Sequence, residues 1–226
     1  MNKITLLAIT LLFSLGCGSK VKDKKRESAN TNTETTFNKL SDNALQEYKV
    51  AYFASGCFWC VEAIYEDIIG VKEVISGYSG GTEKNPTYGQ VGSGSTSHAE
   101  AVKVYYDPNV VDFKTLVKVF FSSHDPTTLN RQGPDYGTQY RSIAFYSNGE
   151  EKKIIEDYID QLTKDKVYKN PIVTQVKKFE VFYDAEEYHQ DYKKLNPNNP
   201  YIINISTPRY NRSKAKYPVL LKKKAD

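Results

Sequence analysis

Residues 49–70 read KVAYFASGCFWCVEAIYEDIIG, and this stretch decides the fold around it. Its first six residues, 49–54, are apolar and β-prone, which predicts a strand. Ser55-Gly56 then breaks the strand. From residue 57 to residue 69 the apolar side chains recur with helical spacing. The stretch therefore predicts a strand, a tight turn and a helix, with Cys57 at the helix start.

The rest of the chain alternates further strands and helices, and this alternation alone favours a doubly wound parallel sheet. Two polar loops of about fifteen residues, 82–97 and 124–140, lie between these elements, and loops of that length inside a compact domain are often functional. Residues from 197 onward are expected to be extended. Strands are predicted over 71–78, 99–106, 142–146 and 173–183, and helices over 113–121, 150–162 and 185–195.

The N-terminus is typical of a targeting segment. Lys3 precedes an apolar run over 4–15 that is too short for a comfortable membrane span and resembles the core of a signal peptide. Gly16-Cys17 follows and resembles a bacterial lipoprotein cleavage site, although Ser14 stands where that pattern usually has Leu. We expect lipid on Cys17, with a plain signal peptide or an uncleaved anchor as the alternative.

Four segments are therefore predicted: a signal peptide over 1–16, a lipid-anchored disordered tether over 17–47, a folded domain over 48–196 and a C-terminal extension over 197–226. The tether is rich in Lys, Ser, Asn, Thr and Glu, and such a composition buries too little apolar surface to fold. The protein would then be exported and held on a membrane of the cell envelope.

The net charge and the cysteine content of the chain limit the functions that it can have. The formal charge is only +4, and no basic face with interleaved aromatics is visible, which argues against a nucleic-acid partner. There are three cysteines, and if Cys17 carries lipid only the C-x-x-C pair of Cys57 and Cys60 remains. One closely spaced pair cannot form the disulfide framework that would stabilise an exported chain of this size. The pair therefore indicates reactive or redox chemistry.

Cys57 is the candidate nucleophile. At a helix start the free amides and the helix dipole favour an anion, so we expect the pKa of Cys57 to lie below its ordinary value of about 8.5. One alternative is an inert buried cysteine or a structural pair with Cys60. Another is half of a zinc site, but the chain has no second C-x-x-C and its three histidines are scattered.

Several motifs, taken in order, resemble those of the type A peptide methionine sulfoxide reductases. GCFWCVE at 56–62 resembles the active-site signature of that family. The resemblance covers about residues 48–195, and its pieces are very specific together. They continue with GYSGG at 77–81, NPTYGQV at 85–91, GSTSHAE at 94–100, HDPT at 124–127, NRQG at 130–133, DYGTQYRS at 135–142 and AEEYHQ at 185–190.

The resemblance implies a fold as well as an activity. It implies an α+β fold, a two-layer α/β sandwich on a mixed, mainly antiparallel sheet with a ferredoxin-like core. This expectation replaces the parallel sheet, because periodicity indicates the elements and not their pairing.

The resemblance also implies roles for residues of the two long loops. Cys57 would attack the sulfur of methionine sulfoxide, and Glu100 would protonate its oxygen, which requires a pKa raised by burial. Tyr88 and Tyr140 would hold the oxygen through their hydroxyl groups. Asp135 would help to bind the substrate.

Phe58 and Trp59 lie beside the nucleophile and would hold the methyl group of the substrate. For Phe58 a place in the core is the alternative. The substrates would be oxidised proteins or peptides, and we expect a monomer.

Cys60 is the candidate resolving cysteine. Many family members carry that cysteine in a C-terminal tail, whereas here none follows Cys60, a position where the family more often has Gly. Cys60 would condense with the sulfenic acid of Cys57, and an external thioredoxin-type dithiol would reduce the disulfide, with no bound cofactor. The alternative is that Cys60 is packing and an external thiol attacks the sulfenic acid directly.

Two other functions compete with this one. An exported C-x-x-C at a helix start also occurs in thiol–disulfide oxidoreductases, but these would need neither Glu100, Tyr88 nor the loop over 124–140. A non-enzymatic lipoprotein, acting as a binding or adhesive module, would need no nucleophile and acid.

Overall fold

The structure is a computed structural model, and it describes residues 41–223. The predicted signal peptide, the lipid site at Cys17 and most of the predicted tether lie outside the described residues, so these remain predictions. None of the helices in the described part of the chain combines the length and the apolar character needed to cross a bilayer.

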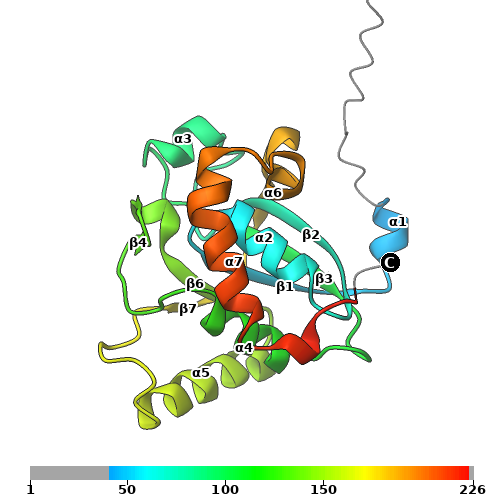
Figure 1. Cartoon of the computed structure of the whole chain (residues 1–226), viewed down its shortest axis with the longest axis vertical. Helices are drawn as coiled ribbons and strands as arrows, with labels where there is room; N and C mark the ends of the chain where they lie inside the picture. The colour runs from blue at the N-terminus through cyan, green and yellow to red at the C-terminus, as the bar shows by residue number, and fades with distance from the viewer. Residues whose placement is uncertain (1–40, 224–226) are drawn as a thin grey trace, which may run out of the picture. The chain divides into compact units, whose positions relative to one another are not determined.

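A six-stranded sheet lies at the centre of the folded body, in the order β7-β6-β1-β3-β2-β8 (Figure 1). Every neighbouring pair is antiparallel except β6 and β7, which are parallel. A separate two-stranded sheet joins β4 and β5. The strands are β1 (Lys49–Ser55), β2 (Val71–Ser79), β3 (Ala99–Tyr106), β4 (Arg131–Gln132), β5 (Asp135–Tyr136), β6 (Ser142–Tyr146), β7 (Gln175–Lys178) and β8 (Phe182–Asp184).

The mixed, mainly antiparallel sheet is confirmed, and the doubly wound parallel sheet is wrong. Helix α2 connects β1 to β2, but these two strands do not pair, because the antiparallel β3 lies between them. The ferredoxin-like label fits only loosely, since two further strands, β7 and β8, extend the sheet at its two edges.

Four of the described helices have eight or more residues, and the other helical segments are shorter. They are α1 (Asp42–Leu45), α2 (Phe58–Glu66), α3 (Tyr88–Gly92), α4 (Phe113–Ser123), α5 (Gly149–Lys164), α6 (Tyr192–Leu195) and α7 (Thr207–Lys214), with short 3-10 turns η1 (Thr138–Tyr140), η2 (Glu187–His189) and η4 (Pro218–Leu220) and the π-helical segment η3 (Ile202–Ser206).

The main core lies between the sheet and helices α2, α4 and α5. Phe53 of β1 stands at its centre, with its ring 5.2 Å from that of Tyr65 in α2 and 5.3 Å from that of Phe120 in α4. All three side chains are buried, and aromatic pairs at these separations add to the burial of apolar surface. This packing fixes α2, and with it the nucleophile at its start, on the sheet.

The opposite face of the sheet carries a smaller cluster. It is covered by the segment between β7 and β8, where Phe179 stacks on Tyr52 with ring centroids 3.6 Å apart. The single strand predicted over 173–183 is therefore wrong: the chain forms β7, crosses this face and forms β8 at the other edge. The helix predicted over 185–195 is likewise two short pieces, η2 and α6.

The C-terminal residues are not extended, contrary to expectation. From residue 202 the chain forms η3 and then α7, which lies beside α2 in Figure 1 and packs on α2 and α4. Pro208 stands in the first turn of α7, where its missing N–H is not needed. The amphipathic pattern is weak because the buried residues of α7 are polar, namely Arg209 and Ser213.

Candidate active site

Cys57 lies where β1 turns into α2, and Gly56 makes that turn possible. Gly56 has a φ of +91°, a conformation that glycine adopts without strain. A Cβ at this position would also lie 2.6 Å from Cβ of Gln132, so a side chain would clash. The backbone thus places Cys57 as the N-cap of α2.

A cavity of about 330 Å³ opens in front of Cys57. Seven of the predicted site residues line it together, although they come from α2, both long loops and β3. Cys60 does not line this cavity. The lining consists of Cys57, Phe58, Trp59, Tyr88, Glu100, Asp135 and Tyr140, together with Asn199 and Tyr201, which sequence analysis did not single out.

Glu100 is the acid of this cavity. Its side chain is only 2% exposed at the start of β3, and its Oε2 accepts a hydrogen bond of 3.0 Å from the backbone N–H of Phe58. Burial raises the pKa of Glu100 to about 8, although the bond from Phe58 acts in the other direction. At neutral pH the carboxyl group therefore carries a proton that it can donate.

The pKa of Cys57 moves against the expectation. Burial raises it well above its ordinary value, and the neighbouring Cys60 and Glu100 add to that effect. The predicted lowering by the helix start is therefore wrong, because burial outweighs it. The first amide of α2, that of Phe58, is moreover bound to Glu100. A hydrogen bond from Tyr201 is the one influence that lowers the pKa of Cys57.

Cys60 behaves in the opposite way. Its pKa is lowered to about 6, chiefly by a hydrogen bond from the Cys57 thiol, with Arg209 and Ser206 acting in the same direction against burial. Both cysteines are unpaired and buried. The two sulfurs therefore share protons as one coupled group, in which the negative charge is more stable on Cys60.

The tyrosine hydroxyls in the cavity remain protonated. Burial raises the pKa of Tyr88 to about 12, and burial together with Glu100 raises that of Tyr140 further still. Protonated hydroxyls are hydrogen-bond donors. Tyr88 and Tyr140 are therefore able to stabilise negative charge that develops on an oxygen atom in this cavity.

Trp59 forms the apolar wall of the cavity and is fixed from two sides. Its ring stacks on Tyr192 at 3.8 Å, and its indole N–H donates to Nδ1 of His189 at 3.0 Å. Phe58 is 1% exposed and packs in the core as well as lining the cavity, so both interpretations of Phe58 hold.

Two further residues hold the cavity wall, and both fall in the AEEYHQ stretch at 185–190. Glu186 accepts bonds from the Tyr88 backbone N–H at 2.9 Å and from the Tyr78 hydroxyl at 2.8 Å. His189 binds Trp59, as described above, and burial lowers the pKa of His189 to about 4, so it stays neutral. The motif indicated that this stretch belongs to the site, but it did not indicate that Glu186 and His189 hold other side chains of the site in position.

Tyr201 is the residue that sequence analysis missed most clearly. Its hydroxyl donates a hydrogen bond of 2.6 Å to Oδ2 of Asp135, and it lies close enough to Cys57 to influence the pKa of that thiol. It lies beyond the last motif, in a chain with 18 tyrosines, so no signal in the sequence distinguished it. Asp135 is thereby fixed at the cavity rim.

Metal chemistry has no support in the arrangement of side chains. Within residues 41–223, no three His, Cys, Asp or Glu side chains are grouped so that they could hold a metal ion. The C-x-x-C pair thus has no further ligands around it there. A nucleophilic cysteine, a protonated acid and hydroxyl donors instead define a cysteine-dependent oxidoreductase that acts on a group bearing an oxygen atom.

Comparison with known proteins identifies the family within this class. Residues 49–219 match the family model of peptide methionine sulfoxide reductase. The chain is 49% identical to peptide methionine sulfoxide reductase MsrA 1 of Rhodopirellula baltica, over 73% of this chain and 86% of that protein. It is 42% identical to the MsrA of Polynucleobacter asymbioticus, over 81% of this chain and 97% of that one.

Comparison with solved structures supports the same family. The reduced form of Mxr1 from Saccharomyces cerevisiae superposes with a TM-score of 0.62 at 35% identity, covering 74% of this chain and 92% of that one. The methionine sulfoxide reductase A of Corynebacterium diphtheriae gives a TM-score of 0.60 at 34% identity, covering 67% and 76%. The chain belongs to the peptide methionine sulfoxide reductase family and is an enzyme that reduces methionine sulfoxide.

The raised pKa of Glu100 predicts a specific effect on stability. In the unfolded chain this carboxyl ionises near pH 4.5, whereas in the folded protein it keeps its proton up to about pH 8. Between these values the folded state binds more protons, so the free energy of unfolding falls as the pH rises. Glu100→Gln removes this term. Urea denaturation from pH 5 to pH 8 should show wild type losing up to about 1.4 kcal/mol per pH unit relative to the variant. A difference that does not change with pH would contradict the raised pKa.

Proposed function

We propose that this enzyme reduces the S epimer of methionine sulfoxide in peptides and oxidised proteins, with Cys57 as nucleophile and Glu100 as acid. The observation that carries the proposal is that a buried, protonated carboxyl group and a buried thiol line one cavity. The family supplies the reaction, and the positions of these two residues supply their roles.

The chemical step balances without a bound cofactor. The Cys57 thiolate attacks the sulfoxide sulfur while Glu100 transfers its proton to the sulfoxide oxygen. The oxygen then moves to Cys57 as a sulfenic acid, and the sulfide of methionine is released. Cys57 is oxidised by two electrons and the substrate is reduced by two.

The cavity lining accounts for the choice of one epimer. The lining contains two hydroxyl donors, Tyr88 and Tyr140, and the apolar ring of Trp59. A sulfoxide bound with its oxygen toward the donors and its methyl group on Trp59 has only one position left for the peptide chain. The opposite epimer would exchange oxygen and methyl group and leave the donors unpaired, which is costly in a buried site.

Separate assays on the two epimers test this proposal. With dithiothreitol as reductant, a peptide carrying the S-sulfoxide should be consumed and its R counterpart should not. Glu100→Gln should lower the rate about 10²–10⁴-fold, the range of general acid catalysis, because it keeps the shape and loses the proton. Equal rates on both epimers, or a fully active Glu100→Gln, would remove these roles.

We also propose that Cys60 resolves the sulfenic acid of Cys57. The two thiols are hydrogen-bonded to each other, and the lowered pKa of Cys60 keeps it as a thiolate at neutral pH. Its attack on Cys57 forms the disulfide and releases the oxygen as water. An external dithiol of thioredoxin type would then return both cysteines to the thiol form.

Cys60→Ser separates the two halves of the cycle. The variant should still reduce about one equivalent of substrate in a single turnover, since Cys57 is intact. It should then accumulate the sulfenic acid, detected by mass spectrometry after dimedone labelling, and turn over slowly with thioredoxin. Wild-type turnover with thioredoxin would show instead that Cys60 is packing.

The thiol–disulfide oxidoreductase is the less favoured alternative. Such an enzyme has no use for a protonated carboxyl group beside its nucleophile. Nor would it need hydroxyl donors from two loops, at Tyr88 and Tyr140, in front of Cys57.

We propose finally that the enzyme is an exported lipoprotein of the cell envelope, tethered through Cys17. This rests on the N-terminal sequence: the apolar run over 4–15 followed by Gly16-Cys17. Expression of the full chain in a bacterial host should give a membrane-bound form that carries lipid, seen by mass spectrometry. Cys17→Ala should abolish the lipid, and a wild-type chain recovered without lipid would refute the proposal.

A further inference from the structure

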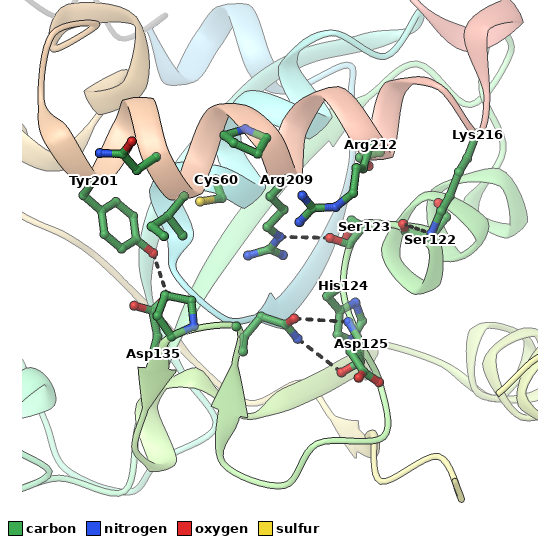
Figure 2. A pocket seen from close by; sticks show the side chains of 17 residues that line it. Cys60, Ser122, Ser123, His124, Asp125, Asp135, Tyr201, Arg209, Arg212 and Lys216 are labelled. Atoms are coloured by element: carbon green, nitrogen blue, oxygen red, sulfur yellow. Dashed lines mark hydrogen bonds between the residues drawn. The ribbon is translucent and has the colours of Figure 1, made fainter. Parts of the chain in front are cut away.

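A second cavity, of about 360 Å³, is lined by Cys60 and not by Cys57 (Figure 2). Two residues, Asp135 and Tyr201, line both this cavity and the substrate cavity. Their hydrogen bond of 2.6 Å therefore forms part of the wall between the two. The remaining lining comes mainly from α7 and from the loop that follows α4.

The two cysteines face different cavities. Cys57 lines the substrate cavity and not the second one, whereas Cys60 lines the second and not the first. Figure 2 shows Cys60 between Tyr201 and Arg209 on the side of α7. A disulfide between the two would thus be approached from the substrate side at one sulfur and from the α7 side at the other.

The second cavity is rich in positive charge. Arg209, Arg212 and Lys216 line it, at spacings of three and four residues that place them on one side of α7 and its end. Arg209 is 8% exposed and donates to the carbonyl oxygens of Ser123 at 2.9 Å and Ser55 at 2.7 Å.

The hydrogen bonds of these cations do not neutralise their charge. The partners of Arg209 are neutral carbonyl groups, and Lys216 likewise donates to the carbonyl oxygen of Ser122 at 2.7 Å. Burial lowers the pKa of Lys216, and the neighbouring positive charge of Arg212 adds to that effect. His124 adds no charge, because burial lowers its pKa to about 3.

Two carboxylates also line the cavity, and both have other partners. Asp125 accepts bonds from the backbone N–H and the hydroxyl of Thr127, at 2.9 and 2.7 Å. Asp135 accepts the bond from Tyr201. Three cations stand against two carboxylates in this lining, so once the cysteines are joined in a disulfide the cavity carries a net positive charge, which favours an anionic ligand.

We propose that this second cavity gives the disulfide a second route of reduction beside the thioredoxin-type dithiol: it binds a small thiol reductant carrying a carboxylate group, whose thiolate attacks Sγ of Cys60 in the Cys57–Cys60 disulfide. The inference rests on the proposed resolving role of Cys60. A volume of about 360 Å³ suits a small molecule. Arg212 and Lys216 would hold the carboxylate near the mouth, and Arg209 would stabilise the charge that develops at the sulfurs.

The electrons balance with two thiols. The first thiolate forms a mixed disulfide with Cys60 and expels the Cys57 thiolate. A second thiol then attacks the reductant's sulfur in the mixed disulfide and releases Cys60. Two thiols are oxidised to one disulfide, and the protein disulfide is reduced to two thiols.

Charge-matched monothiols test the site. Full-length enzyme oxidised by one turnover of substrate is mixed with 3-mercaptopropionate, 2-mercaptoethanol or cysteamine, which are anionic, neutral and cationic, and rates are expressed per thiolate. We expect 3-mercaptopropionate to react on the order of tenfold faster than 2-mercaptoethanol, and cysteamine to react slowest, with the differences shrinking as salt is added.

Two double variants then locate the effect. Arg212→Gln/Lys216→Gln should abolish the preference for 3-mercaptopropionate. Lys152→Gln/Lys153→Gln removes the same charge from exposed positions on α5 and should leave the preference intact. No preference in wild type, or the same loss in both double variants, would overturn the site.

The position of attack is a second, independent measurement. The mixture is quenched with iodoacetamide, and tandem mass spectrometry maps the peptide that holds both cysteines. The thiol should be found on Cys60 and the alkyl group on Cys57, and the reverse pattern would overturn the inference. Failure of the proposed function looks different, since wild type would then not reduce methionine S-sulfoxide even with dithiothreitol.

Discussion

One hydrogen bond joins the parts of the site, that from the backbone N–H of Phe58 to the carboxyl group of Glu100. It links the start of α2 to the start of β3, which are 42 residues apart in the chain. The bond places the acid beside the nucleophile that precedes Phe58. Burial nevertheless dominates the pKa of Glu100, so the same contact that positions the carboxyl group leaves it protonated and able to act as an acid.

The two cysteines therefore differ in protonation: the pKa of Cys57 is raised and that of Cys60 is lowered. Burial, with Cys60 and Glu100 beside it, keeps Cys57 in the thiol form in the free enzyme, although Cys57 stands at a helix start. The charge of the pair rests instead on Cys60, beside Arg209 and the buried hydroxyl of Ser206. The hydrogen bond from Cys57 is the largest influence on Cys60, and the other two stabilising groups belong to the chain after residue 201. A C-terminal segment without a cysteine thus contributes to the environment of the proposed resolving cysteine.

Local sequence predicted much of this site and less of its surroundings. The turn at Gly56, the helix after it and the residues that meet in the substrate cavity could be predicted from short motifs. A short motif indicates the conformation of the backbone that carries it. Strand pairing and the split of residues 173–183 over two sheet edges depend on contacts between distant segments. The predicted direction of the Cys57 pKa was wrong for the same reason, since that pKa depends on burial in the folded protein, and then on Cys60 and Glu100, rather than on the helix alone. Tyr201 and Arg209 are polar residues outside any motif, and only tertiary packing gives them a role.

A charge held on Cys60 affects the two thiol steps in opposite ways. The first step needs the thiolate on Cys57, so a proton has to leave Cys57 before or during attack, and the neighbouring Cys60 thiolate is the nearest base. After the substrate is reduced, the second step needs a thiolate on Cys60, and the environment from α7 favours that state. The arrangement therefore slows formation of the nucleophile somewhat and shortens the life of the sulfenic acid. A short-lived sulfenic acid is protected from further, irreversible oxidation, which suits an enzyme that acts where oxidants are present.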